Sequence, residues 1–122
     1  MTKTILVVDD DPDVRNTIKS VLEKNKYKVI TASSADECLK KLAKESVDLI
    51  LLDIMMPGMA VKEAISKITG IKIMYVTAVQ MSEAERKELL KDKDIVGFIQ
   101  KPFDIKDLVE KVKAAIGVMV VR

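Results

Sequence analysis

The chain contains no histidine, no tryptophan and a single cysteine, Cys38. The absence of histidine removes the side chain used most often for proton transfer in enzymes and a common nitrogen ligand of metals. One cysteine cannot form an internal disulfide, which fits a reducing compartment. No apolar run approaches the length that spans a membrane, and the first predicted strand begins within four residues of Met1. We therefore expect no signal peptide, no transmembrane helix and a cytoplasmic location.

The chain also lacks a strong excess of charge of either sign. Its 21 basic and 19 acidic side chains give a formal net charge of +2, and Lys and Glu alternate instead of forming a basic block. Direct binding of nucleic acid has no electrostatic support in this pattern. With 122 residues, 48% of them hydrophobic and 33% charged, the sequence predicts one compact domain over residues 1–122.

Short apolar runs alternate with longer segments of helical periodicity. Strands are predicted at Thr4–Val8, Tyr27–Thr31, Val47–Leu52, Ile71–Val76 and Ile95–Gln100. Helix starts are predicted from caps and capping boxes at Asp11-Pro12, Ser34 with Glu37, Ser82 with Glu85, and Asp104. The strands are apolar on both faces, which is typical of a parallel sheet covered by helices on each side. The expected fold is an α/β doubly wound sandwich of five β-α units.

Polar side chains follow or close four of these predicted strands. They are Asp9, Asp10 and Asp11 after the first, Asp53 after the third, Thr77 after the fourth and Lys101 after the fifth. Open α/β sheets bind ligands at the carboxyl edge of their strands, so these groups should gather there. Carboxylates with a lysine and a hydroxyl suit a divalent cation together with a phosphoryl group.

Each residue taken alone also has an ordinary structural interpretation. The three aspartates could all cap the first helix, although a cap needs one side chain, and Asp11 is the best placed. Asp53 could form a turn or act as a nucleophile that accepts a phosphoryl group. Thr77 could be a β-branched strand residue and Lys101 a surface lysine. Phe98 is expected to pack in the core.

In combination these segments resemble the receiver domain of two-component response regulators over essentially the whole chain. The matching segments are ILVVDDDP at Ile5–Pro12, DLILLDIMMPGM at Asp48–Met59, VTA at Val76–Ala78 and KPF at Lys101–Phe103. The resemblance implies a flavodoxin-like sandwich with the sheet order 2-1-3-4-5, for which the chemotaxis member of the family is an example.

The resemblance also implies a role for each site residue. Asp53 would be the phosphoacceptor, with Thr77 and Lys101 binding the phosphoryl group. Mg²⁺ would be held by Asp53, by Asp10 directly, by Asp9 chiefly through water and by the main-chain carbonyl of Met55. Thr77 and Phe98 would form the switch, and the Lys101–Pro102 peptide bond would be cis.

The resemblance implies a binding switch rather than an enzyme, one that catalyses only its own phosphorylation and dephosphorylation. Its expected partners are a sensor histidine kinase or phosphotransfer protein and an unknown downstream protein, with no membrane contact. We expect a stand-alone receiver, either a monomer or a homodimer promoted by phosphorylation. The sequence departs from the family at Ala60 and Val61, where Asp-Gly is usual, and in a shortened segment between Asp53 and Thr77.

Two alternatives stay open at this point. The first is a degenerate receiver that acts only as a protein-interaction module. The intact Asp10, Asp53, Thr77 and Lys101 argue against it, whereas the shortened segment keeps it open. The second is a magnesium-dependent phosphatase with an aspartate nucleophile. That chemistry prefers an Asp-x-Asp-x-Thr pattern after the first strand, whereas this chain has Asp-Asp-Asp-Pro.

Overall fold

The computed structural model describes residues 2–53, 66–92 and 94–117. Within these ranges the elements are β1 (Thr4–Val8), α1 (Pro12–Lys24), β2 (Lys28–Ala32), α2 (Ala35–Leu42), β3 (Leu49–Leu52), β4 (Lys72–Thr77), α4 (Glu83–Leu90), β5 (Ile95–Gln100) and α5 (Ile105–Ile116). The helix expected between Asp53 and Thr77 falls mostly outside the described residues. None of the described helices combines the length and the apolarity needed to cross a membrane.

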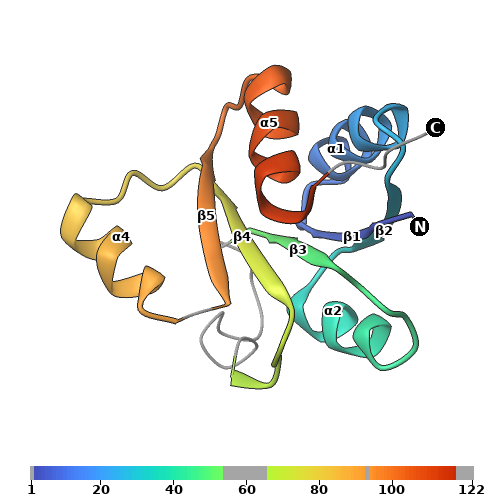
Figure 1. Cartoon of the computed structure of the whole chain (residues 1–122), viewed down its shortest axis with the longest axis horizontal. Coiled ribbons are helices and arrows are strands. Elements are labelled where there is room, and N and C mark those ends of the chain that lie inside the picture. The colour runs from blue at the N-terminus through green and yellow to red at the C-terminus, as the bar shows by residue number, and fades with distance from the viewer. Residues whose placement is uncertain (1, 54–65, 93, 118–122) are drawn as a thin grey trace.

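The five strands form one parallel sheet in the order β2-β1-β3-β4-β5. This confirms the predicted doubly wound architecture and its strand order. Helices α1 and α5 lie on one face of the sheet, and α2 lies on the other (Figure 1). In such a sheet the carboxyl ends of β1, β3, β4 and β5 are neighbours.

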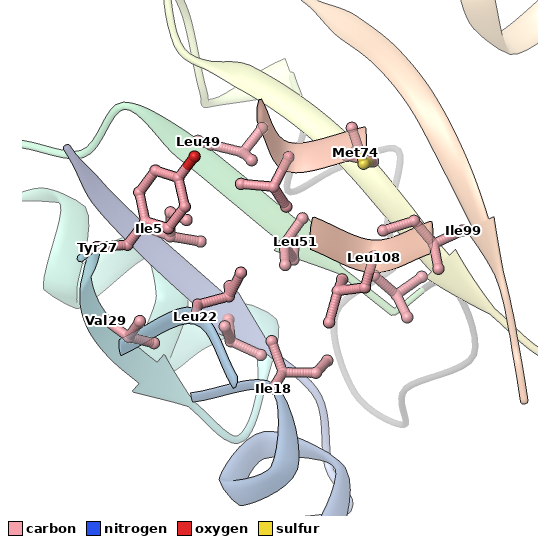
Figure 2. Close-up of a cluster of buried hydrophobic side chains, with 13 residues drawn as sticks. Ile5, Ile18, Leu22, Tyr27, Val29, Leu49, Leu51, Met74, Ile99 and Leu108 are labelled. Atoms are coloured by element: carbon pink, nitrogen blue, oxygen red, sulfur yellow. The ribbon is translucent and has the colours of Figure 1, made fainter. Parts of the chain in front are cut away.

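Two hydrophobic clusters form the core, one on each face of the sheet. In β1, Ile5 and Val7 belong to the cluster under α1 and α5, which we call the first core cluster (Figure 2). Leu6 and Val8 point to the opposite side and belong to the second core cluster, which α2 covers. Every residue of β1 is buried, as expected of a strand that is covered on both faces.

The helix starts follow the predicted caps. Side-chain oxygens accept hydrogen bonds from main-chain N–H groups at Asp11, Ser34, Ser82 and Asp104. Ser82 and Glu85 form a complete capping box. At α2 the box is half formed, because Glu37 accepts a hydrogen bond from the Ser33 hydroxyl instead of from the main chain of Ser34.

Strand boundaries differ from the prediction by one or two residues. β2 and β4 each lie one residue later than expected, and β3 begins at Leu49 instead of Val47. Asp48 explains the late start of β3, since its carboxylate accepts a hydrogen bond of 2.7 Å from the Thr4 amide at the amino edge. At the other edge, Thr77 extends β4 by pairing in register with Gln100.

Candidate functional site

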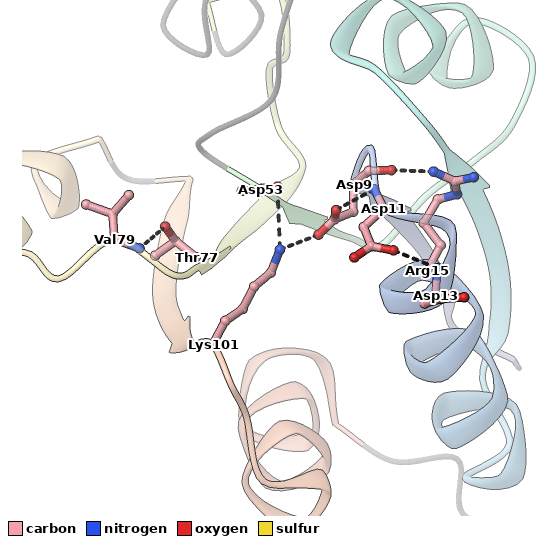
Figure 3. A network of polar contacts seen from close by, with 8 residues as sticks. All are labelled: Asp9, Asp11, Asp13, Arg15, Asp53, Thr77, Val79 and Lys101. Carbon is pink, nitrogen blue, oxygen red and sulfur yellow. Dashed lines mark hydrogen bonds and ion pairs between the residues drawn. The ribbon is translucent and has the colours of Figure 1, made fainter.

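The carboxyl edge of the sheet brings the predicted polar residues together. Main-chain hydrogen bonds continue one residue beyond the strands: Asp9 N–H donates to Ala32 at 3.1 Å and Asp53 N–H to Val8 at 3.0 Å. In the same way Lys101 N–H donates to Thr77 at 2.7 Å. The backbone of each site residue is therefore fixed by the neighbouring strand. Figure 3 shows the Lys101 side chain reaching from the end of β5 toward Asp53 and Asp9.

Three carboxylates form an acidic cluster, which consists of Asp9, Asp10 and Asp53. One oxygen of each lies within 4.8 Å of the others. Asp9 is 2% exposed and Asp53 is 5% exposed, whereas Asp10 is exposed to solvent. Buried like charges at this spacing repel one another unless a cation lies among them. Oxygen donors with this net charge fit a hard divalent cation such as Mg²⁺. Met55, the fourth predicted ligand, lies outside the described residues.

Lys101 supplies a positive charge inside this cluster. Its ammonium nitrogen lies 2.6 Å from Asp9 Oδ2 and 3.5 Å from Asp53 Oδ2. Burial lowers the pKa of Lys101, but the hydrogen bond and charge of Asp9, with the charge of Asp53, outweigh it and raise the pKa. Lys101 is therefore fully protonated at neutral pH. The sequence predicted a pairing with Asp53, and the structure adds a shorter contact with Asp9.

Thr77 is buried at the end of β4, on the side of Asp53 away from Asp9 (Figure 3). Its hydroxyl oxygen accepts a hydrogen bond of 3.0 Å from the Val79 amide. A hydroxyl that accepts in this way can still donate its own proton. The Val79 amide thus fixes the position of the Thr77 hydroxyl oxygen and leaves its proton available for donation.

Arg15 is a contributor to the site that the sequence interpretation missed. Its guanidinium donates a hydrogen bond of 2.6 Å to the main-chain oxygen of Asp9. The Asp9 carboxylate also accepts from the Asp11 amide at 2.9 Å. Asp9 is thus held at two points. Arg15 of α1 binds its carbonyl oxygen, and the Asp11 amide binds its carboxylate. The available signal was spacing, because Arg15 lies one helical turn after the Asp11 cap and can reach back to the end of β1.

The predicted switch residue Phe98 lies within β5, three residues before Lys101. Its ring stacks on the ring of Tyr75, with centroids 5.7 Å apart and an interplanar angle of 24°. The Phe98 side chain packs against the second core cluster, as expected, but it is only partly buried. The Lys101–Pro102 peptide bond is cis, as predicted.

Comparisons with known proteins agree with this geometry. The family model described as the response regulator receiver domain matches residues 5–113. The chain is 34% identical over 116 residues to the alkaline phosphatase synthesis transcriptional regulatory protein PhoP of Bacillus subtilis, covering 93% of this chain and 48% of that protein. It is 33% identical over 115 residues to the heme response regulator HssR of Staphylococcus aureus, covering 91% of this chain and 50% of that protein. The chain thus spans about half the length of these curated relatives.

Solved structures that resemble this chain also include response regulator receiver domains. A CheY-like receiver domain protein from Methanospirillum hungatei is 36% identical, with a TM-score of 0.80 and 94% of both chains covered. The chemotaxis response regulator CheY4 of Vibrio cholerae is 26% identical, with a TM-score of 0.82, covering 94% of this chain and 99% of that one. The similarity therefore extends over nearly the whole described fold.

Proposed function

The chain belongs to the response regulator receiver domain family, and on that premise we propose that Asp53 accepts a phosphoryl group from a phosphohistidine. The donor would be a sensor histidine kinase or a phosphotransfer protein, the partners with which receiver domains interact. One observation carries the proposal: a buried carboxylate ends the central strand beside a lysine and two further carboxylates.

In the proposed reaction a carboxylate oxygen of Asp53 attacks phosphorus in line with the bond to the histidine nitrogen. The phosphorus–nitrogen bond breaks, its electron pair returns to the imidazole, and an acyl phosphate forms on Asp53. Phosphoryl transfer passes through a loose transition state, so positioning and neutralisation of charge supply most of the catalysis. Lys101 provides positive charge 3.5 Å from the Asp53 carboxylate, and Thr77 provides a hydroxyl donor.

The acidic cluster fits Mg²⁺, as its oxygen donors and negative charge indicate. We assign Asp53 and Asp10 as direct ligands, Asp9 as a ligand through water, and the main-chain carbonyl of Met55 as a further donor. When bound, the ion supplies positive charge to the phosphoryl oxygens. The buried hydrogen bonds of Asp9 and the exposure of Asp10 support this division of roles.

Phosphorylation would then change the binding of a downstream protein through Thr77 and Phe98. Thr77 pairs with Gln100 in β5, two residues after Phe98, so a shift of its hydroxyl toward a phosphoryl oxygen would occur on the strand that neighbours Phe98. In this proposal residues 1–122 form one receiver domain that catalyses only its own phosphorylation and dephosphorylation. Phosphorylation can promote a homodimer. A cytoplasmic location stays part of the proposal because the unpaired Cys38 suits a reducing compartment.

The test is direct phosphorylation by a small-molecule phosphodonor in the presence of Mg²⁺, followed by intact mass. Wild type should gain one phosphoryl group, and Asp53→Asn should gain none. Asp36→Asn is the matched control, since Asp36 is an exposed carboxylate in the first turn of α2. A chelator should suppress the gain in wild type.

Two other outcomes would contradict the proposal. A phosphoryl group on Asp53→Asn would show that another residue is the acceptor. No gain in wild type, with Mg²⁺ binding measured separately by calorimetry, would favour the alternative of a receiver that acts only as an interaction module.

A further inference from the structure

Phe98 is contacted by a cation from each of the two helices that flank β5. From α5, the Lys111 ammonium donates a hydrogen bond of 3.1 Å to the Phe98 carbonyl oxygen. From α4, the guanidinium carbon of Arg86 lies 5.8 Å from the centroid of the Phe98 ring. The first contact fixes the main chain, whereas the second acts only on the ring.

The ring of Phe98 lies between the core and the solvent. Tyr75, on which it stacks, is fully buried, Phe98 is partly buried, and Arg86 is exposed. A guanidinium within about 6 Å of a ring centroid is attracted by the negative face of the ring. Arg86 thus favours the position of the ring that the structure shows.

Helix α4 is held to the core much more weakly than α5. No residue of α4 is buried, and Leu89 is its only described side chain that packs against the second core cluster. By contrast, α5 buries Leu108 and Val112 completely. In Figure 1, α4 lies at the margin of the molecule beside β5. Among the described residues, α4 thus meets the sheet side through the packing of Leu89 and through the contact of Arg86 with Phe98.

We propose that Arg86 is a positioning residue for Phe98, which holds the ring in its present orientation and couples that orientation to α4. The inference rests on the proposed function, in which Phe98 changes position when Asp53 is phosphorylated. Arg86 then weights the equilibrium between the two ring positions toward the unphosphorylated one. An exposed cation–π contact changes such an equilibrium by roughly two- to fivefold.

The experiment combines three variants with two measurements. Arg86→Gln removes the charge and leaves a shorter polar side chain, Arg86→Lys restores a cation, and Lys87→Gln removes the same charge from the next residue of α4. The first measurement is the position of the Phe98 ring, from its NMR shifts and its ring-to-ring contact with Tyr75. The chain has only two Phe and two Tyr and no Trp, so these signals are resolvable.

The second measurement is the fraction phosphorylated at a fixed, subsaturating concentration of phosphodonor. We expect Arg86→Gln to move the Phe98 signals and to raise the steady-state ratio of phosphorylated to unphosphorylated chain roughly two- to fivefold. Arg86→Lys should restore part of both, and Lys87→Gln should change neither. Because Arg86 is exposed, all three variants should fold like wild type.

Unmoved Phe98 signals in Arg86→Gln, or equal effects of Lys87→Gln, would overturn the positioning role. Moved signals with unchanged phosphorylation would overturn the coupling. The ring measurement needs no phosphoryl group. A wild type that is never phosphorylated would therefore contradict the proposed function, while the NMR signals would still decide whether Arg86 positions Phe98.

Discussion

Lys101 and Asp9, which are 92 residues apart in the sequence, form an ion pair of 2.6 Å at the carboxyl edge of the sheet. The Lys101 side chain is only 18% exposed and the Asp9 side chain 3%. At this depth an ammonium neutralises charge that solvent cannot, so the lysine stabilises the acidic cluster whether or not a divalent cation binds.

Replacing this lysine should therefore destabilise the fold. Lys101→Met leaves the buried Asp9 carboxylate without its cation, which should lower the free energy of unfolding by about 2–4 kcal/mol in the presence of a chelator. Added Mg²⁺ should restore part of the loss. Urea unfolding with and without Mg²⁺ measures both effects. Lys40→Met, at an exposed lysine of α2, is the control and should change stability by less than about 0.5 kcal/mol. Equal losses in the two variants would contradict the role of the ion pair.

Replacing Asp10 should stabilise the metal-free protein and weaken its binding of Mg²⁺. Asp10→Asn removes one of three crowded negative charges, so the metal-free protein should become more stable by about 0.5–1 kcal/mol. The same change removes a carboxylate ligand and should raise the dissociation constant for Mg²⁺ roughly tenfold or more. Thermal unfolding in chelator and titration calorimetry measure the two effects. Asp13→Asn, on an exposed residue of α1, should leave Mg²⁺ affinity within about twofold.

The Thr77 hydroxyl should matter for both stability and phosphorylation. Thr77→Val keeps the shape of the buried side chain but removes the acceptor of the Val79 N–H, which should cost about 1–2 kcal/mol of unfolding free energy. Phosphorylation by a small-molecule donor should also slow in Thr77→Val. Thr77→Ser retains the hydroxyl and should stay close to wild type in rate. A Val variant with the wild-type rate would remove Thr77 from the proposed mechanism.

The buried thiol of Cys38 predicts a loss of stability in alkali. Burial raises its pKa from the ordinary value to about 11, so the folded chain keeps the proton longer than the unfolded chain does. The contribution of this group is fully present below about pH 9 and is lost as the pH rises toward about 11. Between pH 8 and pH 10.5, wild type should lose about 1–2 kcal/mol more than Cys38→Ala, by chemical denaturation at each pH. Parallel pH profiles for the two chains would rule out this contribution.

Much of the fold could be predicted because its signals are local. The unbroken apolar run of β1, the caps at Asp11, Ser82 and Asp104, and the alternation of strands with helical periods all act over a few residues. The start of β3 was predicted too early because Asp48 bonds to Thr4, which is 44 residues away. Strand ends are set by such pairings with neighbouring strands, which local propensity does not contain.

The sequence by itself determined which polar groups meet at the carboxyl edge, because in a parallel sheet the ends of adjacent strands lie side by side whatever the side chains do. Only the tertiary structure decided which of those groups contact one another and at what distance. It gave Lys101 its shorter contact with Asp9, brought Arg15 to the Asp9 carbonyl and placed Arg86 over Phe98. These contacts depend on side-chain rotamers and on distances of a few ångströms between elements far apart in the chain. Spacing along the sequence fixes the neighbourhood of a residue, whereas packing in three dimensions fixes its partner.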